Sequence, residues 1–416
     1  MNHINPSFSR RFLLILATLA ALGVGCTGNK KSNDSPDIPS QKTRSVVLRA
    51  EVKEGERRSI LSPDDVRSLV KEGIAVDVEK SGARAFPDSE FEAAGAKLVK
   101  SGKWEQGEYE VVAGLKELPS DFSALSGTHF YFSHTYKGQA GAYSVLDRFR
   151  KGNGTIVDLE FIVDENGKRV AAFGKWAGSA GMYLGLLRWA HRKLGYSTER
   201  TNEEIRSYNK VGQDIFRSSE AQAHLKNLFR QTGTPKVVVI GATGRSGTGA
   251  VEMAESSGVP GDSIRKLGRS DTSDANQYDE LIKWPDVLVN CVVTYPGDDA
   301  RPFITAQSLN ETQGPLSVVV DVTADTTSDL NRLPFLTEET SFENAVVSKS
   351  YGGRDIEAIV IDHLPTLFPR ESSIFFSSKI IPHLKSFLIH QSSSEVERAI
   401  DKYKEVISQL EDKGAN

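Results

Sequence analysis

The sequence has very few cysteines, and their number limits the chemistry that the chain can hold. Among 416 residues only Cys26 and Cys291 occur, so a disulfide framework and a cysteine-rich zinc site are both excluded. Cys291 lies in the apolar run VLVNCVV, where a buried, unreactive thiol is the expected state. We therefore expect neither a metal centre nor a catalytic thiol.

The chain also lacks an excess of positive charge. Its 51 Lys and Arg are outnumbered by 55 Asp and Glu, for a net charge of -4. Because proteins that bind nucleic acid need clustered cations to neutralise phosphates, no nucleic-acid partner is expected. The content of 38% hydrophobic and 25% charged residues is typical of globular proteins and argues against a multi-span membrane protein.

The length of 416 residues predicts two domains.

The apolar stretch near the N-terminus is too short to cross a membrane. Residues 12–25 follow Arg10 and Arg11 and precede the polar run TGNKKSNDSPDIPSQ, whereas a span needs about 20 apolar residues. This pattern is typical of an export signal. We expect residues 1–43 to be a signal-like segment and linker that targets the chain to an exported, membrane-associated or organellar compartment. A wrongly assigned start codon and a cytoplasmic protein are the alternative.

Short apolar strands alternate with helices in two stretches of the chain. In the first, SVVLRAEV, IAVDVE, residues 110–115 and HFYFSH are strands. Between them SPDDVRSLVKEG is a helix, with Ser62 as N-cap, Pro63 in the first turn and Gly73 at its end. The second stretch has the helix WAGSAGMYLGLLRWAHRKLG and the strands KVVVIG, VLVNCVV, LSVVVDV and AIVID. The pattern predicts an α/β fold with parallel sheets, and a surface helix ends the chain.

Residues 236–250, KVVVIGATGRSGTGA, join a buried strand to a helix through a glycine-rich turn. Glycines let the backbone turn sharply and approach a pyrophosphate, and the helix N-terminus adds free N–H groups. The strand before and the helix after are the context that this motif requires. We therefore expect a dinucleotide at Gly241, Gly244, Arg245, Ser246 and Gly247, with a structural turn in a cofactor-free sheet as the alternative.

The end of the next strand bears on the choice of coenzyme. An acid that binds the adenosine ribose is expected there, but the sequence reads SIRKLGRSD, with Gly268 followed by Arg269. An arginine at this place can pair with a 2′-phosphate. NAD is the expected coenzyme, and NADP is the alternative. Asp271 could reach the ribose through a slightly longer loop and serve as the acid that favours NAD.

Six segments together resemble a known family. They are LRAEVKEGERRSILSP (48–63), GLKELP (114–119), FSHTYKGQAG (132–141), DLEF (158–161), GRSGTG (244–249) and VIDHLPTLFPRE (360–371). In this order they resemble the lysine-forming saccharopine dehydrogenases of the alanine dehydrogenase and transhydrogenase superfamily, over about residues 45–385. The resemblance implies two Rossmann-like α/β domains with an active-site cleft between them. It assigns residues 44–172 and 363–416 to a catalytic domain and residues 173–362 to a dinucleotide-binding domain.

The resemblance also implies a reaction and its residues. The family oxidises saccharopine, a secondary amine, to an imine that hydrolyses to lysine and 2-oxoglutarate, in lysine biosynthesis by the aminoadipate route. By their positions in the motifs, the implied catalytic residues are Lys116 and His134. The residues implied to tune the pKa of these two are Glu117, Glu160 and Lys137. The implied carboxylate binders are Arg58 and Arg169, and Asp362 is expected to face the nicotinamide. The alternative for Asp362 is a cap of the following turn. We expect a monomer.

Two segments depart from the family pattern. They are GKWAGSAGMY (174–183) and SKSYGGRDIE (348–357), which we expect near the coenzyme, and Ser246 stands where some relatives carry a cysteine. Two other functions therefore stay open. One is a related NADPH-linked imine or amino-acid dehydrogenase with a different substrate. The other is a catalytically silent nucleotide-binding protein tethered to a membrane by its N-terminal segment.

Overall fold

The computed structural model describes residues 44–106, 109–119, 124–208, 210, 214–295, 297–298, 300–391 and 393–414. The predicted targeting segment, residues 1–43 with Cys26, lies outside this part of the chain. Within the described part, no helix has the length and apolar character that crossing a membrane requires.

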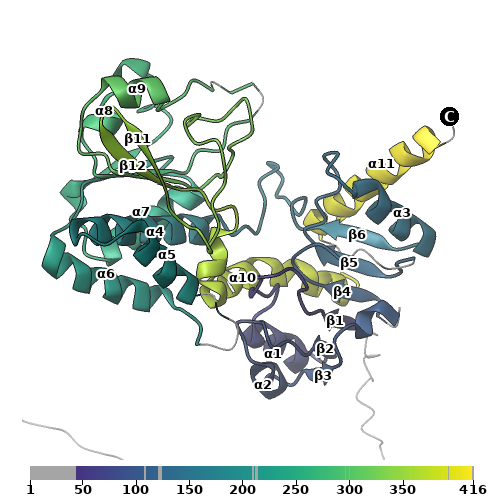
Figure 1. Cartoon of the computed structure of the whole chain (residues 1–416). Coiled ribbons are helices and arrows are strands. Elements are labelled where there is room, and N and C mark those ends of the chain that lie inside the picture. Colours follow the sequence, from purple (N-terminus) through teal and green to yellow (C-terminus); the bar gives the residue numbers. More distant parts are fainter. Residues whose placement is uncertain are drawn as a thin grey trace, which may run out of the picture. The chain divides into compact units, whose positions relative to one another are not determined.

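The described residues form two six-stranded sheets, one from each of the predicted stretches (Figure 1). The first sheet has the order β3-β2-β1-β4-β5-β6, and its pairs are parallel. Its strands are β1 (Val46–Leu48), β2 (Val76–Glu79), β3 (Lys97–Val99), β4 (Val111–Ala113), β5 (Thr128–Tyr131) and β6 (Thr155–Asp158). The second sheet has the order β11-β12-β10-β9-β7-β8. Its strands are β7 (Val237–Ile240), β8 (Ile264–Leu267), β9 (Val287–Asn290), β10 (Val318–Asp321), β11 (Val347–Tyr351) and β12 (Arg354–Ile359).

Helices cover both faces of these sheets. They are α1 (Pro63–Lys71), α2 (Asp88–Ala93), α3 (Ala142–Gly152), α4 (Gly174–Lys193), α5 (Thr198–Ser207), α6 (Ser218–Thr232), α7 (Arg245–Ser256), α8 (Glu280–Lys283), α9 (Ala306–Glu311), α10 (Pro369–Leu388) and α11 (Ser394–Gly414). Successive strand residues point to opposite faces, so Val237 and Val239 of β7 enter one core while Val238 and Ile240 enter another. Burial on both faces explains why β7, with the sequence VVVI, is apolar without interruption.

Local signals fix the predicted first helix. The Ser62 side chain accepts a hydrogen bond from the Asp65 backbone N–H at 3.2 Å, Pro63 begins α1, and Gly73 has a φ of +83° just after the C-cap. Proline suits the first turn, where its missing N–H costs nothing, and glycine suits the left-handed position after a helix. The predicted caps are confirmed.

The last two helices return to the first sheet. Phe376, Ile380 and Leu384 of α10 are fully buried in the same core as strands β1 and β4. On α11, the Tyr403 hydroxyl donates to the Gly154 carbonyl at 2.9 Å, beside β6. Figure 1 shows both yellow helices next to strands β1 to β6. The first sheet is therefore completed by residues from both ends of the described chain.

One edge of the second sheet differs from the prediction. The departing segment 348–357 forms the hairpin of β11 and β12, which pair antiparallel around Gly352 and Gly353, with φ of +56° and +79°. This edge strand departs from the parallel pairing that the sequence predicts for the sheets. In the strand order, β11 is at one edge, and β7, which leads into the glycine-rich turn, is next to β8 at the other edge.

Candidate active site

A cavity of about 770 Å³ is lined by residues that follow the carboxyl ends of strands in both sheets. The carboxyl ends of parallel strands are where α/β proteins bind their ligands. From the predicted set, the lining includes Arg58, Lys116, His134, Lys137, Glu160, Arg169, Arg245 and Ser246. The structure thus brings the predicted catalytic residues, the carboxylate binders and the start of α7 to one place. We call it the active-site cavity.

The lining of the active-site cavity is strongly basic. Its cations are Arg58, Lys116, Lys137, Lys168, Arg169 and Arg245. Glu160 is the one carboxylate among the described residues that line it. A cavity with one sign of charge attracts and concentrates ligands of the other sign. The site is therefore suited to a small molecule with several carboxylates.

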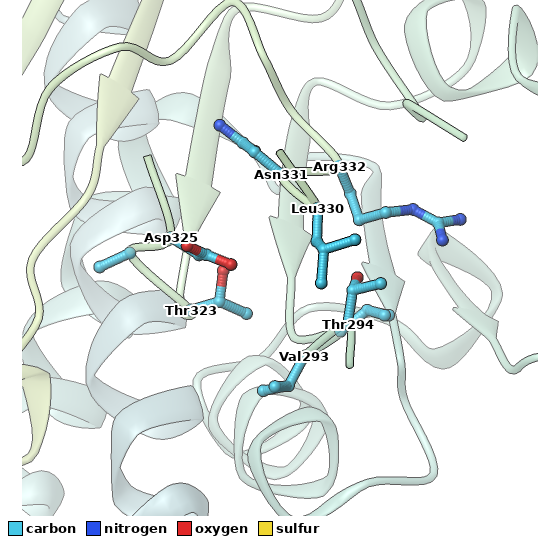
Figure 2. Close-up of a pocket in the computed structure, with 9 residues that line it drawn as sticks. Val293, Thr294, Thr323, Asp325, Leu330, Asn331 and Arg332 are labelled. Carbon is cyan, nitrogen blue, oxygen red and sulfur yellow. The ribbon is translucent and has the colours of Figure 1, made fainter. Parts of the chain in front are cut away.

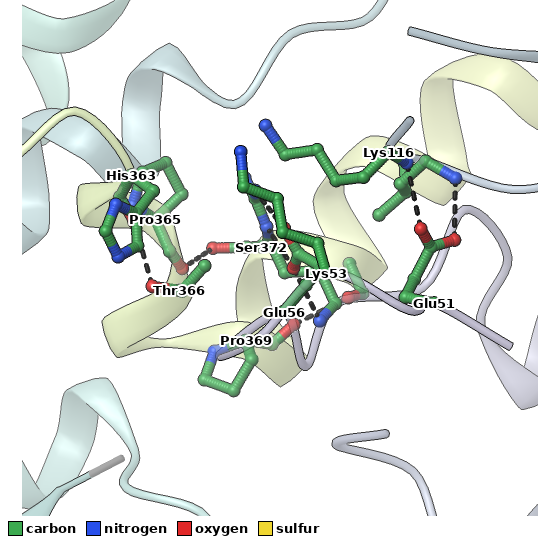
Figure 3. A network of polar contacts seen from close by, with 12 residues as sticks. Glu51, Lys53, Glu56, Lys116, His363, Pro365, Thr366, Pro369 and Ser372 are labelled. Carbon is green, nitrogen blue, oxygen red and sulfur yellow. Dashed lines mark hydrogen bonds and ion pairs between the residues drawn. The ribbon is translucent and has the colours of Figure 1, made fainter. Parts of the chain in front are cut away.

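Lys116 sits just after β4, on a turn that Glu51 holds. Glu51 accepts hydrogen bonds from the backbone N–H groups of Leu115, at 2.7 Å, and Lys116, at 2.9 Å (Figure 3). Burial lowers the pKa of the Lys116 ammonium, and the nearby charges of Arg58 and Lys53 lower it further. The neutral amine, which can accept a proton, is therefore easier to reach here than in water.

His134 follows β5 in a left-handed conformation, with a φ of +52°. Such a backbone is unusual for a residue other than glycine and is frequent at functional sites. Its Nδ1 lies 2.8 Å from the Glu117 carboxylate. The hydrogen bond from His134 lowers the pKa of Glu117 to about 2, assisted by the charges of Lys53 and Lys116. With Nδ1–H donating to Glu117, the lone pair of the neutral ring is at Nε2.

Arg58 is the member of the Arg57–Arg58 pair that lines the cavity. Its guanidinium binds Glu56 through two hydrogen bonds of 2.8 and 2.6 Å and lies 4.3 Å from the centre of the Phe173 ring. Burial favours the protonated form of Glu56, but the charge and hydrogen bonds of Arg58 outweigh it, so the pKa of Glu56 is lowered. Arg57 instead donates to the Ala83 carbonyl.

Glu160 joins two cations of the lining. Its carboxylate lies 3.0 Å from Lys137 Nζ and 3.0 Å from an Arg169 nitrogen, so two of the three residues named as tuning the catalytic pKa values pair with each other. Burial works to raise the pKa of Glu160, but the charges of Arg169 and Lys137 outweigh it and lower that pKa. Arg245 donates to the Arg169 carbonyl, which ties the start of α7 to the same wall.

A second cavity, of about 400 Å³, adjoins the glycine-rich turn and includes Gly241, Gly244, Gly268 and Arg269 in its lining. Gly241 has a φ of +77°, and Gly244 is the N-cap of the 12-residue helix α7. A turn without side chains at the N-terminus of a helix fits a pyrophosphate. We call it the coenzyme cavity. Cys291, which is half-buried, lines both cavities, and burial raises the pKa of its thiol.

Two predicted coenzyme residues are outside the linings of both cavities. Gly247 lines neither cavity, and a Cβ there would lie 2.1 Å from the Gly241 carbonyl oxygen. Its part is to let α7 approach the turn closely. Asp362 is exposed where the chain leaves β12 and also lines neither cavity. The neighbouring His363 is partly buried, edge-on to Phe342 at 5.2 Å, and burial lowers its pKa.

The loop after β10 closes a smaller cavity of about 250 Å³, which shares Val292, Thr294 and Arg332 with the coenzyme cavity. In Figure 2, Asp325 and Thr323 lie together, and the guanidinium of Arg332 points away from them. Among the described residues, no group of three or more His, Cys, Asp and Glu is placed to hold a metal ion.

The sequence prediction missed three residues of this site. Lys53 lies 3.9 Å from Glu117, Glu51 fixes the Lys116 turn, and Glu56 holds Arg58. All three fall in the segment LRAEVKEGERRSILSP, where the alternation of charges was visible. The partners of these charges lie up to 65 residues away in sequence, so the pattern alone could not assign them.

Known proteins are similar to this chain in sequence and in fold. Residues 47–180 match the family described as "Alanine dehydrogenase/PNT, N-terminal domain". The chain is 39% identical over 345 residues to the saccharopine dehydrogenase [NAD(+), L-lysine-forming] of Yarrowia lipolytica, covering 81% of this chain and 90% of that protein. It is 40% identical to the enzyme of the same name from Schizosaccharomyces pombe, covering 81% and 91%. The chain belongs to the saccharopine dehydrogenase family.

The fold of this family member is shared more widely. A solved L-alanine dehydrogenase superposes with a TM-score of 0.59 at 19% identity, covering 88% of this chain and 99% of that one. At this identity the likeness shows the fold alone. It confirms the prediction of two Rossmann-like α/β units.

Proposed function

We propose that the chain catalyses the reversible, NAD-linked conversion of saccharopine and water to lysine and 2-oxoglutarate. The observation that carries the proposal is the basic active-site cavity, in which Lys116 and His134 lie together and which shares Cys291 and Val293 with the coenzyme cavity. Saccharopine bears several carboxylates around a secondary amine, which fits a lining of cations around two groups that can exchange protons. NAD, when bound, supplies the hydride acceptor.

Arginine side chains orient the substrate in this proposal. The planar guanidinium groups of Arg58 and Arg169 suit carboxylates because each can donate two parallel hydrogen bonds. Arg58 is held in place by Glu56 and the Phe173 ring, and Arg169 by Glu160. Side chains that are already fixed lose less conformational entropy when the substrate binds.

We assign the proton exchange at the substrate nitrogen to Lys116. Loss of hydride from the carbon next to nitrogen requires the neutral amine of the substrate, so a base must take its proton first. The lowered pKa of Lys116, caused by burial and by Arg58, favours the neutral lysine that this step needs. The product of hydride loss is a protonated imine between the two amino-acid parts.

We assign the water step to His134. When water adds to the imine carbon, one proton of the water molecule must be removed. The Nε2 lone pair of His134 can take that proton, because Nδ1 donates to Glu117 at 2.8 Å and the carboxylate stabilises the imidazolium that forms. The same ring then returns that proton to the nitrogen, and the hydroxyl proton passes to solvent as the carbon–nitrogen bond breaks and the carbonyl forms, which releases lysine and leaves 2-oxoglutarate.

We also propose a division into domains on the basis of the cores. Residues 44–172 and 363–416 would form the catalytic domain, because α10 and α11 pack in the cores of the first sheet. Residues 173–362 would form the dinucleotide-binding domain. We further propose a monomer that acts in lysine biosynthesis, with residues 1–43 as a targeting segment. Arg10 and Arg11 before a short apolar stretch support the last proposal.

The test is to follow NADH loss at 340 nm with lysine and 2-oxoglutarate. We expect turnover with this pair and at least about a hundredfold loss of kcat in Lys116→Met and in His134→Gln, the scale of losing a general acid or base. Lys100→Met, an exposed lysine outside the active-site cavity, is the matched control and should keep full activity.

Two outcomes contradict the proposal. Pyruvate and ammonia reacting as fast as lysine and 2-oxoglutarate would favour a different amino-acid dehydrogenase. An unchanged kcat in both variants would remove the Lys116–His134 pair from the chemistry.

A further inference from the structure

We propose that the coenzyme cavity also takes the 2′-phosphorylated coenzyme, with the 2′-phosphate against Arg269. The inference rests on the proposed function only in placing a pyridine nucleotide in this cavity. The relatives named above carry NAD(+) in their names. A second coenzyme would therefore be a property of this chain's own residues at the adenosine end.

The acid that would reject a 2′-phosphate is absent from the lining. Strand β8 ends at Leu267, and Gly268 stands where a carboxylate would bind the ribose hydroxyls. Asp271 could have taken its place through a longer loop, but its carboxylate accepts the Gly268 backbone N–H at 2.7 Å and closes the turn. Asp271 does not line the cavity, whereas Gly268 and Arg269 do.

Arg269 is available to a phosphate. Its side chain is 92% exposed, and its ion pair with Asp298 has a nitrogen–oxygen distance of 3.6 Å. An exposed pair at this distance contributes little to stability, while an arginine binds a phosphate through short, charge-assisted and often paired hydrogen bonds. Exchanging Asp298 for a phosphate is therefore favourable. Without the phosphate, the pair with Asp298 persists and the unphosphorylated coenzyme still fits.

The surroundings of Arg269 favour an anion as well. Arg332 lines the same cavity as a second cation, buried with its guanidinium 4.0 Å from the centre of the Phe303 ring. Thr272 and Ser273 add hydroxyl groups to the lining. Among the described lining residues, Asp298 is the one carboxylate. The described lining of the coenzyme cavity thus carries two arginines and one carboxylate, a balance that favours an anionic ligand.

The experiment separates the phosphate from the rest of the coenzyme. Binding of adenosine 2′,5′-bisphosphate and of adenosine 5′-monophosphate to the full chain is measured by titration calorimetry. We expect the bisphosphate to bind at least as tightly as the monophosphate. In Arg269→Ala, the Kd of the bisphosphate should rise about tenfold or more and that of the monophosphate less than about threefold.

Arg265→Ala is the matched control. Arg265 is also exposed and lies on β8, but it packs on the Trp284 ring and does not line the cavity. It should leave both Kd values unchanged. A bisphosphate that binds tenfold more weakly than the monophosphate to the unaltered chain, or an equal loss of both ligands in Arg269→Ala, overturns this inference alone. If neither ligand binds, the coenzyme cavity does not hold the adenosine end of the coenzyme, and the placement of the coenzyme is contradicted as well. Turnover with NADH in that case would leave the proposed function standing.

Discussion

At the scale of single residues, the surroundings of Lys116 oppose its charged form. Burial lowers the pKa of this ammonium below its usual 10.5, and the charges of Arg58 and Lys53 lower it further. The unfolded chain then binds the proton more tightly than the folded one, so folding carries a penalty at every pH below about 10.5. The penalty shrinks as the pH rises towards that value. The buried ammonium of Lys116 therefore costs stability at pH 7.

Lys116→Met should make the protein more stable while it abolishes turnover. Removing the buried ammonium removes the penalty, so we expect the free energy of unfolding at pH 7 to rise by on the order of 1 kcal/mol. The gain should fade near pH 10, where the lysine of the unfolded chain also loses its charge. Thermal unfolding midpoints at pH 7 and pH 10 measure both effects.

Lys137→Met is the control for this prediction. Lys137 is 60% exposed and pairs with Glu160 at 3.0 Å, so its removal should change stability by less than about 0.5 kcal/mol at either pH. A lower midpoint of Lys116→Met at pH 7 would show that the ammonium makes a net stabilising contact.

At the scale of elements, glycines let α4 and α7 touch. A Cβ on Gly178 would lie 1.7 Å from the Ser246 carbonyl oxygen, and one on Gly249 would lie 1.8 Å from the Lys175 carbonyl oxygen. Both obstacles are backbone atoms of the facing helix, which cannot move without shifting the helix. Since α7 also begins at the coenzyme cavity, this close contact positions the N–H groups that would meet the pyrophosphate.

Gly249→Ala should therefore weaken both the fold and the coenzyme site. Forcing the helices apart is expected to lower the free energy of unfolding by about 2 kcal/mol or more. It should also raise the Kd for NADH about threefold or more, because the start of α7 moves. Denaturant unfolding and fluorescence titration with NADH measure the two changes.

Gly261→Ala provides the comparison. A Cβ on Gly261 would meet no atom within 4 Å, so both quantities should stay near those of the unaltered chain. Equal behaviour of the two variants would mean that α4 and α7 can separate at no cost, contrary to the packing described above.

Elements with local signals could be predicted from the sequence, and elements made by distant partners could not. Ser62, Pro63 and Gly241 act within a few residues, so α1 and the β7–α7 turn were foreseen. Strand β11 has four exposed residues before the buried Tyr351 and shows no apolar alternation, so it exists through pairing with β12. The family motifs named Lys116, His134 and Glu117, but only part of the environment that holds them. That environment depends on contacts such as Glu51 with Lys116, 65 residues apart.

At the scale of the whole molecule, charge is unevenly distributed. The chain has a net charge of -4, yet the active-site cavity collects cations around Glu160 alone among the described lining residues. The electric field of these cations raises the local concentration of anionic substrates and acts over distances longer than a direct contact. It is weakened by salt, because the Debye length falls from about 10 Å at 0.1 M ionic strength to about 3 Å at 1 M.

The two substrates of the reductive direction should respond differently to salt. 2-Oxoglutarate is a dianion drawn to the cavity, so its KM should rise about fivefold between 50 mM and 500 mM NaCl. Lysine carries a net positive charge, so its KM should stay level or fall. Repeating the series with sodium acetate separates ionic strength from competition by chloride. The prediction is contradicted if the KM for 2-oxoglutarate is unchanged in both salts while the KM for lysine rises. That result would mean that the cations around Glu160 do not act on the substrate. Rates at saturating substrate, which leave binding out, should change little in either salt.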